Sequence, residues 1–200
     1  MDGRRAFRKT MLALLLASSS ASFSPTAQRL RTSVKAARPL LDNGGWLFHY
    51  ADTRPYTLET PEAQAFVATN VAFTIAGAAI ATTGGDLALG ALTEAAGIAS
   101  VGYHASQCHL GGTNRTVVQF FMLIDYALAL PTLAGGAFYA SGLGDALPQG
   151  AIVCAILSGA ALVGGWFFES PRQYMLLHGL WHVFGAAAAY QLAIAGGSLT

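Results

Sequence analysis

Five apolar segments, each about 20 residues long and joined by short loops, constrain the fold of this chain more than any other feature. They span about residues 64–84, 87–109, 116–140, 149–168 and 173–196. Within lipid, only helices and closed barrels satisfy all backbone hydrogen bonds, and a helix of about 20 residues crosses the hydrocarbon core. Short loops favour antiparallel neighbours. The sequence therefore predicts an all-α, polytopic transmembrane helix bundle of about five helices.

The composition agrees with a bundle that is embedded in lipid. Of the 200 residues, 54% are hydrophobic and only 10% are charged, whereas soluble domains carry about 25% charged residues. Many of the 23 glycines lie within the apolar segments, where small residues let helices pack closely. The body of the chain lacks the basic and aromatic surface that binds nucleic acid. We therefore expect the lipid bilayer, and no nucleic acid, as a partner.

Residues 1–41 differ from the rest of the chain and have the composition of a targeting presequence. They hold eight of the eleven Lys and Arg residues, and no acid lies between Asp2 and Asp42. A basic start, a short apolar run and a cluster of small residues predict a signal peptide over about residues 1–22. Residues 23–41 are rich in Arg, Ser, Thr and Ala, which predicts a transit-like segment.

The junction at Ser22 and Phe23 resembles that of algae with a secondary plastid, where an aromatic residue leads the transit peptide. This resemblance predicts an integral protein of a plastid membrane. An ordinary secretory signal followed by a basic linker would instead direct the protein to the endomembrane or secretory pathway, and this alternative stays open. In both cases we expect residues 42–200 to form the transmembrane helical domain.

Five polar residues interrupt three of the apolar segments. His178 and His182 lie four residues apart in the last segment, and therefore on one face of a helix. Ser100 and His104 have the same spacing in the second segment, and the third contains Asp125. Counting ~1.5 Å per residue from the segment ends places all five roughly 7–14 Å below the same membrane surface. Ionisable groups at this depth are costly and usually face the protein interior, so the spacing predicts one shared site.

These residue types indicate hydrolysis assisted by zinc. Three neutral imidazoles form a zinc site with its fourth position open to water. Zinc lowers the pKa of that water to about 7, and an adjacent carboxylate can accept its proton. The predicted zinc ligands are His104, His178 and His182. We expect Asp125 to act as the base and Ser100 to orient the water or stabilise a developing oxyanion, and burial in lipid favours a lipid substrate.

At these residues the chain resembles the CREST superfamily of membrane hydrolases, which includes alkaline ceramidases and adiponectin-type receptors. Members share Ser-x-x-x-His on the second helix, Asp on the third and His-x-x-x-His on the last. The matching residues here are Ser100, His104, Asp125, His178 and His182. An Asn on the family's first helix corresponds to Asn70. The resemblance implies a zinc site that cleaves an amide or ester bond in a membrane lipid. Family members usually have seven helices, whereas this chain has five apolar segments.

Three alternatives stay open from the sequence. The chain could be a non-catalytic relative, a membrane receptor or scaffold that keeps the fold and the metal. Two of the histidines could instead be axial ligands of a haem, which would need facing helices separated by a flat gap. Finally, Cys108 and His109 could join His104 in a different metal site at the membrane surface.

Overall fold

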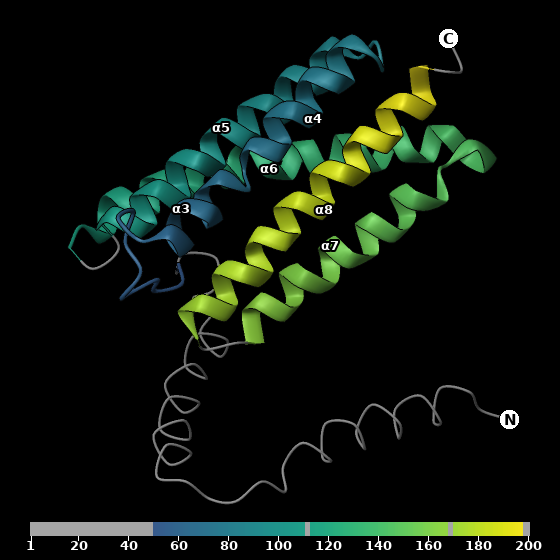
Figure 1. Ribbon diagram of the computed structural model, residues 1–200. Helices are drawn as coiled ribbons and strands as arrows, with labels where there is room; N and C mark the ends of the chain where they lie inside the picture. Colours follow the sequence, from purple (N-terminus) through teal and green to yellow (C-terminus); the bar gives the residue numbers. More distant parts are fainter. Residues whose placement is uncertain (1–49, 111–112, 168–169, 198–200) are drawn as a thin grey trace, which may run out of the picture. The chain divides into compact units, whose positions relative to one another are not determined.

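The computed structural model describes residues 50–110, 113–167 and 170–197 (Figure 1). Contacts divide the chain into two units, Met1–Asn43 and Gly44–Thr200, and all described residues belong to the second. The expected presequence over residues 1–41, with its signal and transit-like parts, lies outside the described residues.

All helices predicted from the sequence are present, and the regular elements of the described residues are all helical. They are α3 (Pro61–Ala68), α4 (Val71–Thr82), α5 (Leu87–Leu110), α6 (Arg115–Leu143), the 3-10 turn η2 (Gly144–Ala146), α7 (Gln149–Phe167) and α8 (Pro171–Gly197). The prediction of an all-α fold with five long helical segments is therefore confirmed, with α3 and α4 together forming the first segment.

Two helical stretches within the described part of the chain are long and apolar enough to cross a membrane, Pro61–Thr82 and Arg115–Ala146. Only 28% and 17% of their most apolar stretches are buried against the rest of the chain, unlike the core helix of a soluble protein. Helices α5 and α8, which contain Ser100 and the three histidines of the predicted site, do not meet this test, whereas Asp125 lies on α6, which does.

Side chains at the helix starts explain where several helices begin. The Thr60 hydroxyl accepts a hydrogen bond from the Ala63 backbone N–H, and Pro61 follows as the first helical residue. Asp86 accepts from the Leu89 N–H at 2.9 Å before α5, and Asn114 caps α6. These are the residue types that satisfy the free N–H groups of a first turn.

Most helices that are consecutive in the sequence pack against each other, as the short loops predict, but α6 and α7 do not form an extensive contact. The packing order is α6, α5, α4, α8 and α7, so that α4 lies between α5 and α8 (Figure 1). The short helix α3 also packs against both α5 and α8. The residues of α5 and α8 that face each other therefore meet beside α3 and α4.

Glycine allows α4 and α5 to approach closely. A Cβ atom added at Gly77 would lie 2.7 Å from the backbone nitrogen of Glu94 and from the carbonyl oxygen of Gly90. A Cβ atom at Gly90 would lie 2.7 Å from the backbone nitrogen of Ala81. Because these neighbours are backbone atoms, no side-chain rotation could relieve the contact.

We expect Gly77→Ala to destabilise the bundle, because the added methyl group forces α4 and α5 apart. Overpacking of this kind costs about 1–3 kcal/mol. Thermal unfolding of the purified protein in detergent would measure the loss. Gly136→Ala in α6 is the matched control, since a Cβ atom there meets nothing within 4 Å. Equal unfolding temperatures for the two variants would contradict the prediction.

The first apolar segment is two helices because it tightens at Thr69 and Asn70. The backbone N–H of Asn70 donates to the carbonyl of Val67, three residues back, at 3.2 Å. The side chains reinforce this turn, since the Thr69 hydroxyl donates to Phe66 at 2.6 Å and the Asn70 amide donates to Val67 at 3.0 Å. Polar side chains that bond to nearby carbonyls compete with the α-helical pattern, and here they separate α3 from α4.

Several polar side chains lie inside the bundle, and many large apolar side chains are exposed. Phe138 is 82% exposed and Leu130 is 64% exposed, and both lie on α6. The buried polar residues include Asn70, Thr93, Ser100, His104, Gln107, Asp125, Ser158 and His182. The described part of the chain thus combines a core that contains several polar side chains with many exposed large apolar ones.

Candidate metal site

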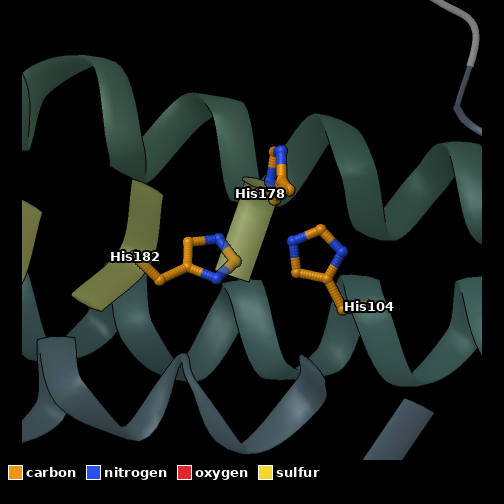
Figure 2. A group of neighbouring side chains, drawn as sticks. All are labelled: His104, His178 and His182. Carbon is orange, nitrogen blue, oxygen red and sulfur yellow. The ribbon is translucent and has the colours of Figure 1, made fainter. Parts of the chain in front are cut away.

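Helices α5 and α8 bring three histidines together. His104 lies near the end of α5, and His178 and His182 lie on one face near the start of α8. Their ring centres are between 4.8 and 5.1 Å apart, and Figure 2 shows the rings turned toward one another. The potential ligand nitrogens all lie within 4.8 Å of one another, so the group could hold a metal ion. Among the described residues it is the only such group of His, Cys, Asp or Glu.

The nitrogens are somewhat farther apart than in a metal-bound site. With metal–nitrogen bonds of ~2.0–2.1 Å in a tetrahedral arrangement, ligand nitrogens are about 3.3 Å apart. The potential ligand nitrogens lie within 4.8 Å of one another, so a tetrahedral site would require the rings to move inward. The three rings extend toward one another from their helices (Figure 2).

The hydrogen bonds of His104 fix which of its nitrogens faces the group. The Gln107 Nε2 donates to the backbone carbonyl of Ala51 at 2.7 Å, which places the Gln107 Oε1 against the His104 Nδ1 at 2.8 Å. Because Oε1 only accepts, the His104 Nδ1 must donate, and Nε2 is left with a lone pair. His104 is fully buried, and its Nε2 has no hydrogen-bond partner in the described structure. A buried acceptor without a partner is costly, and a metal ion at Nε2 would satisfy it.

The hydrogen bonds of His182 fix its tautomer in the same way. Its Nδ1 lies 3.0 Å from the hydroxyl oxygen of Thr69, and that hydroxyl already donates its single proton to the Phe66 carbonyl. The Thr69 oxygen must therefore accept from Nδ1, which leaves Nε2 of His182 as the acceptor. Two of the three rings thus present an unprotonated Nε2, the form that binds metals.

Aromatic rings surround the three histidines. The Phe66 ring centre lies 4.6 Å from that of His104, 6.0 Å from that of His178 and 6.2 Å from that of His182. Tyr174, one turn before His178, lies 5.2 Å from it. These side chains hold the imidazoles in an apolar setting, which strengthens electrostatic interactions at the site.

Residues 50–60, here called the N-terminal strap, lie over this end of the bundle. Its partly buried Ala51, Tyr56 and Leu58 pack against a cluster that includes Phe66 and Tyr174. The exposed part of the strap has an ion pair in which hydrogen bonds from the Arg54 side chain lower the pKa of the Asp52 carboxyl. The strap therefore packs over the end of the helices that contains the three histidines. Its Ala51 carbonyl accepts the hydrogen bond from Gln107.

The predicted acid and hydroxyl form a pair of their own. Asp125 on α6 and Ser100 on α5 are 8% and 6% exposed, and the two side chains interact with each other. Asp125 also interacts electrostatically with Tyr103, the residue next to His104. Asp125 does not belong to the group whose ligand atoms lie within 4.8 Å of one another, so the structure places it beside the histidines' neighbours rather than among the ligand atoms.

Three other residues singled out from the sequence lie outside the histidine group. Asn70 is fully buried at the break between α3 and α4, and its Oδ1 has no hydrogen-bond partner in the described structure. Cys108 is buried, whereas His109 is exposed. Cys108 and His109 therefore point to different surroundings and do not assemble a second metal site with His104.

The arrangement also disfavours a haem. The rings of His104 and His182 are 5.1 Å apart between centres, and Phe66 packs against both. A porphyrin needs a flat gap between its two axial ligands, and at this place the side chains themselves occupy the space.

Sequence reasoning missed four residues of the site: Phe66, Thr69, Gln107 and Tyr174. Two of them had a local signal, because Gln107 lies three residues after His104 and Tyr174 lies four residues before His178, one helical turn in each case. No local pattern in the sequence indicated Phe66 or Thr69. Thr69, for example, is separated from His182 by 113 positions.

Comparison with known proteins adds no assignment to this site. Neither the models of known families, nor curated proteins, nor solved structures match the chain. The resemblance of the motif to the CREST superfamily therefore stays a prediction, and the functional argument rests on the residues themselves.

Proposed function

We propose that this chain is a multi-pass membrane protein that holds a zinc ion at His104, His178 and His182 and hydrolyses an amide or ester bond in a membrane lipid. The observation that carries the proposal is the cluster of three converging imidazoles, of which His104 and His182 are buried and in which Nε2 of His104 has no other partner in the described structure. The resemblance of the polar motif to the CREST superfamily supports the same class of reaction.

The donor set favours zinc among the common metals. Three nitrogen donors without a carboxylate or thiolate suit zinc and exclude the oxygen-rich sites of calcium and magnesium. Ligating histidines usually donate their second ring nitrogen to a neighbouring acceptor, as His104 and His182 do to Gln107 and Thr69. When bound there, zinc supplies a Lewis acid and lowers the pKa of a water molecule toward neutrality.

Asp125 and Ser100 supply the proton-transfer chemistry in this proposal. The Asp125 carboxylate accepts a proton from the attacking water and returns it to the leaving amine or alkoxide. The interaction of Ser100 with Asp125 orients the carboxyl group in this proposal. Both residues are buried, so bulk water does not compete for the proton.

The apolar outer surface supports a lipid substrate. Large apolar side chains are exposed on several helices, among them Ile75, Ile98, Phe138 and Ile156. In a bilayer these side chains contact acyl chains directly, so a lipid reaches the protein by lateral diffusion. The scissile bond of a lipid lies near the membrane surface, and the histidines lie near the end of α5 and near the start of α8, which in a spanning bundle would be close to that surface.

A non-catalytic metal-binding membrane protein, a receptor or scaffold, is the second candidate. One observation favours it: Asp125 is engaged with Ser100 and is not part of the histidine group. In this alternative the metal ties α5 to α8 and has a structural role.

Metal analysis, visible absorption and lipid hydrolysis by the full chain purified in detergent test the proposal. We expect one zinc per chain, no Soret band, and release of fatty acid from a panel of ceramides and glycerolipids. Purified protein that binds no zinc would overturn the proposal, and a Soret band would favour haem. Stoichiometric zinc without hydrolysis of any lipid would favour the receptor or scaffold.

We also propose that the protein resides in a plastid membrane and that residues 1–41 are its targeting sequence. A fluorescent protein fused behind residues 1–41 is expected to enter the plastid of an alga with a secondary plastid. A fusion behind residues 1–22 alone is expected to stay in the secretory pathway, because it lacks the transit-like segment. Fluorescence microscopy separates the two, and secretory localisation of both fusions would support the endomembrane alternative.

A further inference from the structure

The histidine cluster is held from outside by two hydrogen bonds that cross between segments. Gln107 connects His104 to the strap carbonyl of Ala51, and Thr69 connects His182 to the Phe66 carbonyl at the break between α3 and α4. Gln107 is 1% exposed, so water does not replace its contacts, and Thr69 is half-buried. Gln107 donates to Ala51, so its oxygen must accept the proton of His104. Thr69 donates to Phe66, so its oxygen must likewise accept the proton of His182.

We infer that Gln107 and Thr69 are positioning residues that hold His104 and His182 in the tautomer with an unprotonated Nε2 facing the metal. This inference rests on the proposed zinc site and deepens it. A neutral imidazole free of such partners exchanges its proton between Nδ1 and Nε2 and rotates about its side-chain bonds. An acceptor at Nδ1 removes both freedoms and makes the ligating nitrogen more basic.

The inference assigns a purpose to two features of the fold that packing alone does not explain. The turn at Thr69 and Asn70 places the Thr69 hydroxyl between the Phe66 carbonyl and the His182 ring. The strap provides the Ala51 carbonyl that orients the Gln107 amide, although Ala51 and Gln107 are 56 positions apart. The segments preceding α4 thereby become part of the metal site.

Variants at Gln107 separate positioning of His104 from anchoring of the strap. Gln107→Met keeps a side chain of similar size but removes the hydrogen bonds to His104 and to Ala51. Gln107→Glu keeps an acceptor for the His104 Nδ1–H but cannot donate to the Ala51 carbonyl. We expect Gln107→Met to weaken zinc binding by about 10–100-fold, the usual loss for such partners, and Gln107→Glu to bind at least as tightly as the natural protein. If Gln107 only anchors the strap, both variants should lose the same affinity.

Two variants of Thr69 provide an independent test. Thr69→Val removes the acceptor for the His182 Nδ1–H without changing the shape of the side chain, and Thr69→Ser retains it. We expect a loss of about 10–100-fold for the first and little change for the second. This pair keeps the inference testable if Gln107→Met does not fold.

Two matched controls make the same substitutions away from the site. Thr93→Val alters a buried threonine whose hydroxyl bonds to Leu89 within its own helix. Gln191→Met alters a glutamine of α8 that bonds to Cys154 and Ala187. Neither residue touches a histidine of the group, so zinc affinity should stay within about twofold, well below the 10–100-fold loss expected at the site.

The test uses the full chain in detergent, with zinc affinity from chelator competition and the visible spectrum of the Co²⁺-loaded protein. Loss of affinity and an altered Co²⁺ spectrum in Gln107→Met and Thr69→Val, with rescue in Gln107→Glu and Thr69→Ser, would support the inference. Natural affinity in both Gln107→Met and Thr69→Val, or equal loss in Gln107→Met and Gln107→Glu, would overturn it while leaving the zinc site intact. Failure of the natural chain itself to bind zinc would instead refute the proposed function.

Discussion

Replacement of His104, His178 or His182 by Ala is expected to abolish stoichiometric zinc binding. Each variant leaves two imidazoles, too few for a protein zinc site of three ligands and water. The loss of zinc affinity should be larger than the loss of about 10–100-fold that follows removal of a hydrogen-bond partner of a ligand. Metal content after dialysis against a weak chelator would measure it.

The same three variants should remove the thermal stabilisation that zinc provides. A ligand that binds only the folded state stabilises it by about 2.7 kcal/mol at one hundred times its dissociation constant. We therefore expect a strong chelator to lower the unfolding temperature of the natural protein, and to have little effect on the variants. The three histidines belong to α5 and α8, so the metal connects two helices that α3 and α4 separate.

His109→Ala is the control for these experiments. His109 lies on the same helix as His104 but is exposed and outside the group. We expect it to retain one zinc per chain. A histidine variant of the group that binds zinc as tightly as His109→Ala would contradict the assignment of that residue as a ligand.

Asp125→Asn is expected to lower the rate of lipid hydrolysis by about 10²–10⁴-fold while leaving zinc content unchanged. Asparagine has nearly the same shape and can still bond to Ser100, but it cannot take a proton from water. Because Asp125 lies outside the group of ligand atoms, the substitution should not affect metal binding. The measurement is fatty acid release per zinc-loaded chain.

Asp145→Asn is the matched control, since Asp145 is exposed in the turn η2. It should retain full hydrolysis and full zinc content. Natural activity in Asp125→Asn would exclude Asp125 as the base. Loss of zinc in Asp125→Asn would show that the carboxylate supports the metal, which contradicts its separation from the ligand atoms.

Much of the fold follows from local patterns in the sequence. The segment expected over residues 116–140 corresponds to α6, and that over 173–196 corresponds to α8, because long apolar runs bounded by polar turns favour helices. The break at Thr69 was not predicted, since it depends on side chains that bond to carbonyls three residues back. Thr and Asn occur within many continuous helices, so the sequence alone gives no sign of it.

The sequence by itself determined which helices contain the polar residues and how far each residue lies from its helix end, because helical rise acts locally. That reasoning placed His104 level with His178 and His182, and the three rings do meet. Only the tertiary structure decided how the rings are held. Thr69 and Ala51 reach the site through contacts that span 113 and 56 positions, and hydrogen-bond direction at such distance depends on packing that no local pattern encodes.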